Sequence, residues 1–259
     1  MKGIIWHLRG EFGSFRPYDT TSIIDTYLFP PKTTIIGMIG AACGWSEDEL
    51  VEYYDKIKVG IKIKHFDGIF NDLVKIWKVS EATKQSRWLY ISENKIYSFE
   101  ELCKKLSAPI LRQIFVVVKR YLYRPVFTIY IATPENKKLI NKIATALKDP
   151  VYPITLGDSD SLFYPKDLEY VEVVNIQNVK SNKFRCLLDA EVVCEQGKGI
   201  KLTGESNLTL YPRHTTMLVG FEPKRKNPKK RKIICFIGEI ELKKEIDAYR
   251  FKEESVYLF

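Results

Sequence analysis

The chain has 259 residues, and its hydrophobic content of 45% and aromatic content of 13% indicate a folded globular protein and exclude an intrinsically disordered one. No apolar run approaches the ~20 residues that cross a bilayer, and MKGIIWHLRGEFG lacks the apolar block of a signal peptide, so we expect a cytoplasmic protein without a membrane partner. The net charge is +9 at pH 7. Seven of the positive charges, with no acid among them, lie in KRKNPKKRK (224–232). This stretch, called the basic segment below, indicates binding to nucleic acid or another anionic surface.

The first third of the chain alternates strands and helices. Residues 2–12 alternate as a strand does, with Ile4, Trp6 and Leu8 on one face. A helix is expected from about 34 to 42, and a second in SEDELVEYYDKI, where Ser46 and Glu49 have capping-box spacing. Residues 57–66 and 73–79 read as strands around a turn. Residues 80–112 read as an insertion with a short helix in SFEELCKKL.

The middle of the chain completes the same unit. QIFVVVKRYLYRPVFTIYIAT is rich in β-branched and aromatic residues, as strands are. PENKKLINKIATALKD carries an apolar stripe of Leu139, Ile140, Ile143 and Leu147 at helical spacing. After the turn YPITLGDSDSLFYP comes the strand LEYVEVVNI. The order β-α-β-β-α-β predicts an α+β, ferredoxin-like unit with an insertion.

Beyond about residue 176 the pattern is almost entirely β. Strands are expected in FRCLLDAEVVC, GIKLTGESNLTLY, TTMLVGFEP and KIICFIGEIEL, and the last two flank the basic segment, which is therefore expected at the tip of a hairpin. We predict two domains: residues 1–175, ferredoxin-like with the insertion at about 80–112, and residues 176–259, an antiparallel β-rich lobe.

The sequence offers little for metal or nucleotide chemistry. The five cysteines are dispersed without a CxxC pair, which indicates reduced thiols. The three histidines lie far apart and lack metal-ligand spacing, so we expect no metal or cofactor. Metal-free RNA cleavage needs only a base, an acid and a cation near a 2′-hydroxyl. His65 after Lys64, and His214 after Arg213, keep that option open.

The stretch FPPKTTIIGMIGAACGW (29–45) combines a rigid start with a glycine-rich helix. Thr33 or Thr34 can cap the helix, and a helix start with Lys32 beside it suits a phosphate. Each glycine costs about 1 kcal/mol in a helix, so a group must pack very close. Helix-on-sheet packing suits Gly40 and Gly44, whereas Gly37, in the first turn, is the better candidate for ligand approach.

Three segments, in order, resemble a CRISPR-associated family, the fifth in the Cas numbering, of the RAMP superfamily of RNA-binding proteins. They are FGSFRPYDTTSIIDTYLFPPKTTIIGMIGAACG (12–44), RYLYRPVFTIYI and YPITLGDSDSLF. The resemblance implies a ferredoxin-like (RRM-like, RAMP) domain with an inserted thumb and a β-rich C-terminal part. It also implies a subunit of the type I interference complex (Cascade) that holds the 5′ handle of crRNA, with the backbone and large subunits as partners. One branch of the family cleaves precursor crRNA with a Tyr/Lys/His-type site, but PPKTT looks like the non-cleaving branches.

We therefore expect a non-catalytic crRNA-binding subunit for antiviral defence, with a metal-independent endoribonuclease of the same fold as the alternative. No catalytic residue is assigned. The expected RNA-binding residues are Arg16, Lys32, Thr33, Thr34, Gly37, Lys224, Arg225, Lys226, Lys229, Lys230, Arg231 and Lys232.

Overall fold

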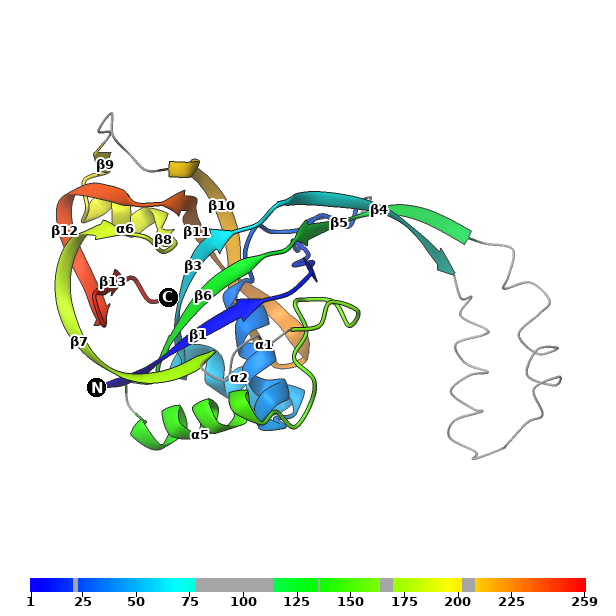
Figure 1. The fold of residues 1–259 in the computed structure, drawn as a ribbon, viewed down its shortest axis with the longest axis horizontal. Helices are drawn as coiled ribbons and strands as arrows, with labels where there is room; N and C mark the ends of the chain where they lie inside the picture. Colours follow the sequence, from blue (N-terminus) through cyan, green and yellow to red (C-terminus); the bar gives the residue numbers. More distant parts are fainter. Residues whose placement is uncertain (21–22, 78–113, 135, 164–169, 202–207) are drawn as a thin grey trace.

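Seven antiparallel strands form the main sheet of the molecule (Figure 1). The computed structural model describes residues 1–20, 23–77, 114–134, 136–163, 170–201 and 208–259. The strand order is β13-β12-β7-β1-β6-β3, with β9 paired to β12. The bounds are β1 Lys2–Arg9, β3 Lys58–His65, β6 Val126–Ala132, β7 Val171–Phe184, β9 Ile200–Lys201, β12 Ile240–Phe251 and β13 Glu254–Val256.

Three helices pack against one face of the central strands (Figure 1). They are α1 (Lys32–Cys43), α2 (Glu47–Lys56) and α5 (Lys137–Lys148). The capping box of α2 is confirmed, because the Ser46 side chain accepts from the Glu49 main chain and the Glu49 side chain accepts from the Ser46 main chain. The predicted stripe of α5 is confirmed by burial of all four apolar residues, and Asn136 caps that helix.

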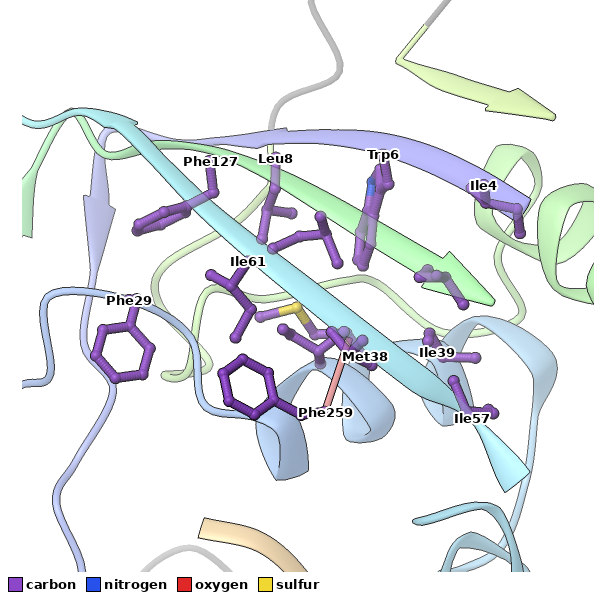
Figure 2. Packing of buried hydrophobic residues seen from close by; sticks show 14 of the residues in the cluster. Ile4, Trp6, Leu8, Phe29, Met38, Ile39, Ile57, Ile61, Phe127 and Phe259 are labelled. Carbon is purple, nitrogen blue, oxygen red and sulfur yellow. The ribbon is translucent and has the colours of Figure 1, made fainter. Parts of the chain in front are cut away.

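The two faces of the sheet carry two hydrophobic cores. Ile4, Trp6 and Leu8 of β1 point into the core beneath the helices, as the alternation predicted (Figure 2). Ile5 points the other way and packs with residues of β7, β12 and β13. Both faces of β1 are therefore buried, which is why the strand is mostly apolar.

A long two-stranded arm leaves the body of the molecule (Figure 1). It consists of β4 (Gly68–Trp77) and β5 (Ile114–Tyr123), paired over ten residues, with β2 (Phe12–Gly13) at its base. The predicted insertion at 80–112 and its short helix lie outside the described residues.

A third sheet carries the basic segment. It is made of β10 (Leu208–Glu222), β11 (Lys226–Gly238) and β8 (Leu188–Asp189), in the order β10-β11-β8. The 3-10 turn Pro223–Arg225 joins β10 to β11. The hairpin is confirmed, but the basic segment is not only its tip, because residues 226–232 are part of strand β11 itself.

One predicted strand is partly wrong. In FRCLLDAEVVC the chain leaves β7, makes the short strand β8 and then forms helix α6 (Ala190–Glu195). Asp189 starts this helix, because its carboxylate accepts hydrogen bonds from the Glu191 and Val192 main chain at 2.9 and 3.4 Å. An acidic cap thus overrides the β-like composition of the segment.

The predicted domain boundary at 175/176 falls inside β7, so strands from both parts share one sheet. Separate folding of residues 1–175 and 176–259 stays a prediction. Among the described helices, none has the length and apolar content needed to span a bilayer.

Candidate nucleic-acid interface

Helix α1 begins at Lys32, two residues earlier than predicted, with Pro31 at its N-cap. Pro31 has no side-chain donor or acceptor, so neither threonine is the cap that we expected. Thr33 and Thr34 lie in the first turn instead, where main-chain N–H groups have no partner within the helix. Both threonines are half-buried and line a cavity, so these donors lie beside a space that a ligand can enter.

The predicted role of Lys32 is corrected by its environment. Its side chain is buried, with 6% exposure, and its ammonium group donates to the main-chain oxygen of Phe259 at 3.1 Å. Burial lowers the pKa of Lys32 to about 8, against the opposing effect of Asp55. Lys32 therefore ties α1 to the chain near Phe259 and does not face an external phosphate.

The three glycines of α1 have three different environments. A Cβ on Gly40 would overlap the side chain of Leu50 in α2, so this glycine permits close packing of two helices and not, as predicted, of the helix on the sheet. Gly44 has φ +70° and ends the helix, as left-handed glycines commonly do. A Cβ on Gly37 would have nothing within 4 Å, so no packing within the described protein explains that glycine.

A cavity of about 440 Å³ lies beside the first turns of α1, and we call it the α1 cavity. It brings Thr33, Thr34 and Gly37 together with Lys224 of the basic segment. Two parts of the sequence almost two hundred residues apart, each predicted to bind RNA, thus share one space. The other lining residues are Met38, Ala41, Glu47, Leu50, Val51, Tyr54, Pro153, Thr155, Gly157, Phe221 and Glu222.

Three cations of the basic segment have protein partners. Lys229 contacts Asp55 of α2 at 3.2 Å, and Arg231 contacts the buried carboxylate of Asp189 at 3.1 Å.

The third of these cations, Lys230, lies 3.8 Å from the centroid of the Tyr18 ring. These contacts anchor strand β11 to three separate parts of the chain.

Three other cations of the basic segment lack such partners among the described residues. Lys224, Lys226 and Lys232 have no ion-pair partner among the described residues, and the side chain of Arg225 is not described. Strand β11 pairs with β8 only at Ile233 and Ile234, so within the described chain the outer edge along 226–232 carries no strand. Free charge and free main-chain groups therefore lie along the same edge.

Arg16 is not brought to the α1 cavity. Its guanidinium donates to the main-chain oxygen of Thr20 at 3.0 Å within an exposed turn. Arg16 is not one of the described residues that line the α1 cavity. Its predicted place beside α1 therefore needs correction, and contact with RNA elsewhere stays a prediction.

The family model of CRISPR-associated protein (Cas_Cas5) matches residues 3–209. The chain belongs to this family. No curated protein matches it. Among solved structures, a "CRISPR RNA-guided surveillance complex" chain has 18% identity and a TM-score of 0.52, covering 91% of this chain and 90% of that chain. A CRISPR protein from Archaeoglobus fulgidus has 16% identity and a TM-score of 0.52, covering 99% and 98%. These likenesses show that this Cas5-family protein shares the α+β fold of Cas proteins, with mostly antiparallel strands and few helices.

The histidines of this Cas5-family chain lie on three different strands. His7, on β1, contacts Thr128 at 3.2 Å, and its pKa is lowered by burial and by Lys64. His65, on β3, is exposed and contacts Asp67 at 2.6 Å. His214 lies on β10. In the part of the chain that the structure describes, no three His, Cys, Asp or Glu side chains form a metal-binding group.

Sequence reasoning missed the tie between the arm and the GDSDS loop. Lys119 of β5 forms an ion pair with Asp158. The loop also approaches Ser14 closely. A Cβ on Gly157, which has φ +90°, would overlap the main-chain oxygen of Ser14. The only signal in the sequence was the glycine within a polar turn, a common site of positive φ.

Proposed function

We propose that this Cas5-family protein is a subunit of a CRISPR RNA-guided complex and holds the 5′ handle of crRNA without cleaving it. The observation that carries the proposal is the α1 cavity, in which the first turn of α1, the open face of Gly37 and the cation of Lys224 line one space. A solved structure with the same fold is titled a CRISPR RNA-guided surveillance complex, which supports the same assignment.

The lining of the α1 cavity suits one phosphate and its neighbouring sugar. The main-chain N–H groups and hydroxyls of Thr33 and Thr34 can donate to phosphate oxygens, and the helix start adds partial positive charge. Lys224 supplies a full charge. Glu47 and Glu222 line the same cavity, and Glu222 accepts a hydrogen bond from Asn227 at 2.6 Å, so in this proposal the phosphate lies beside the threonines.

The free edge of β11 extends this site. Lys224, Lys226 and Lys232 lack ion-pair partners among the described residues and can contact separate phosphates of a single strand. Contacts of this kind fix the position of an RNA without reading its sequence. In this proposal, base pairing of the guide supplies the target specificity.

The strand order supports a ferredoxin-like (RAMP) core as part of the proposal. Strands β1, β3, β6 and β7 occur in that chain order and lie in the sheet as β7-β1-β6-β3. Helices α1 and α2 connect β1 to β3, and α5 connects β6 to β7, which is the β-α-β-β-α-β arrangement. The backbone and large subunits of the complex are the proposed protein partners.

Incubation of the purified protein with CRISPR repeat RNA in the presence of a chelator tests the proposal. Binding without cleavage is expected. Site-specific cleavage under these conditions would instead favour the metal-independent endoribonuclease, and an absence of binding would refute both functions.

A charge-matched pair of variants tests the site. The first replaces the three unpaired cations with glutamine: Lys224→Gln, Lys226→Gln and Lys232→Gln. The control removes three exposed cations of α5: Lys138→Gln, Lys142→Gln and Lys148→Gln. If each unpaired cation contacts one phosphate, the slope of log K against log[salt] should become shallower by about 2, at ~0.7 per single-strand contact. The control should keep the wild-type slope, and equal slopes for both variants would refute the site.

A further inference from the structure

A second cavity, of about 530 Å³, lies between the loop after β2 and strand β10, and we call it the loop cavity. Residues 17–20 and 25–29 form one wall, and residues 213–216 form the opposite wall. Arg120, at the base of the arm, closes one side. The volume falls in the range of sites that hold a small organic ligand, and no motif in the sequence indicated this cavity.

An exposed aromatic ring lies at this cavity with a cation over it. The Tyr18 side chain is 43% exposed and lines the loop cavity. The ammonium group of Lys230 lies 3.8 Å from its ring centroid. Proteins that bind single-stranded nucleic acid combine these two elements, because the ring stacks on a base and the cation neutralises the adjacent phosphate.

The charges around the loop cavity decide which part of a nucleotide enters it. Asp25 is already neutralised, since its carboxylate accepts from Arg120 at 3.3 Å and from the Thr26 main chain at 2.8 Å. The Asp19 carboxylate, which also lines the cavity, has no hydrogen-bond partner among the described residues. A free carboxylate repels phosphate but accepts hydrogen bonds from the exocyclic amino group of a base.

Two cations lie beside the same space. Arg213 lines the loop cavity and is exposed on β10. Lys230 belongs to the exposed edge of β11. Lys230 covers one face of the Tyr18 ring and leaves the other face for a base near Asp19, while Arg213 and Lys230 favour the adjoining phosphate.

We propose that the loop cavity binds one unstacked, amino-bearing nucleotide of a single-stranded RNA, with Tyr18 as the stacking platform. The inference rests on the proposed RNA-binding function and adds a base-holding site to it. Lys230 and Arg213 contact the phosphate, and Asp19 accepts a hydrogen bond from the base. The α1 cavity and the loop cavity then hold two points of one strand that follows the edge of β11.

Fluorescence anisotropy with labelled oligo(A) and oligo(U) decamers tests the inference. Tyr18→Ala should weaken oligo(A) binding about tenfold, which is within the range of one lost base–aromatic stack. Its salt slope should change by less than one phosphate contact, because stacking releases no counterions. Tyr18→Phe keeps the ring and should bind within twofold of wild type.

Tyr211→Ala is the matched control, because Tyr211 is 76% exposed and lies on β10 outside the residues that line the loop cavity. It should bind as wild type does. Asp19→Ala should reduce the preference for oligo(A) over oligo(U), since uracil has no amino group to donate.

Two outcomes overturn the inference. In the first, wild type binds the decamers and the triple glutamine variant of the basic segment binds more weakly, but Tyr18→Ala has the same affinity as Tyr211→Ala. This result refutes the base site and leaves the proposed function standing. If wild type binds neither decamer nor repeat RNA, both the base site and the proposed function are refuted. Melting temperatures of all variants identify any that lose affinity through unfolding.

Discussion

Gly37→Ala should make the protein more stable while making it a weaker RNA binder. Glycine within a helix costs about 0.5–1 kcal/mol relative to alanine, and a Cβ at this position would have nothing within 4 Å. The full gain in helix propensity is therefore available without a steric penalty. For a chain of this size a gain of about 1 kcal/mol corresponds to a rise in Tm of about 2–4 °C.

The same methyl group would project into the α1 cavity, where the RNA backbone is proposed to approach. Displacing that backbone from the helix start weakens the hydrogen bonds that Thr33 and Thr34 can donate. A charge-assisted hydrogen bond contributes about 1.5–3 kcal/mol, so a loss of about tenfold in affinity for repeat RNA is expected. Differential scanning fluorimetry and anisotropy on the same preparation measure both effects.

Gly44→Ala is the control on the same helix. Gly44 has φ +70°, which strains any residue with a Cβ, so Tm should fall, while the affinity of the folded protein should be unchanged because neither Gly44 nor its neighbour Val151 lines the α1 cavity. Full RNA affinity in Gly37→Ala, with the expected rise in Tm, would show that no RNA backbone approaches this glycine. A fall in Tm for Gly37→Ala would contradict the open space that a Cβ at position 37 would enter.

Substitutions at three further positions test the local environments of the groups replaced. Lys32 has a folded pKa of about 8, below its unfolded value of about 10.4, so the free energy of unfolding should rise by roughly 3 kcal/mol as pH increases from about 8 to 10.4. Lys32→Met should abolish that rise in urea titrations. An unchanged rise in the variant would mean that other groups cause it. Gly157→Ala should lower Tm by several degrees in thermal melts, since its Cβ would overlap the Ser14 oxygen at a positive φ; an unaltered Tm would show that the loop shifts freely. Asp189→Ala should lower the free energy of unfolding by about 1–3 kcal/mol, because it removes both a helix cap and the partner of Arg231. Asp189→Asn keeps the cap and should lose less stability in chemical denaturation. Equal losses in the two variants would mean that the cap contributes nothing.

Local signals predicted the elements that depend on local interactions. The capping box of α2 needs only Ser46 and Glu49, and the stripe of α5 needs only the helical period. The role of Gly44 at the helix end was also accessible, because glycine commonly ends a helix, but Gly37 lies in the second turn of α1 and not in the first, since the helix begins at Lys32. For Gly40 the sequence predicted close packing but not its partner, which is Leu50 of α2.

Contacts between distant parts of the chain were not predictable in this way. Lys32 resembled a phosphate ligand because its neighbours are a helix start and two threonines, but its partner Phe259 is 227 residues away. The basic segment resembled a solvated loop, yet Lys229 and Asp55 are 174 residues apart. Charge counts identify how many cations a segment has, and only the fold decides which of them have partners.

Burial is the main cause that lowers the pKa of Lys32, and Asp55 connects the surroundings of this lysine to the anchoring of β11. Lys58, Lys229 and Arg231 all act to lower the pKa of Lys32, and Asp55 acts to raise it. Asp55 also pairs with Lys229, so one carboxylate offsets positive charge on both the helix start and the strand. The Lys32 ammonium itself donates to the main-chain oxygen of Phe259 and is turned away from a ligand. The donors left for a phosphate in the α1 cavity are therefore the neutral N–H and hydroxyl groups of the first turn, with Lys224 as the nearby charge.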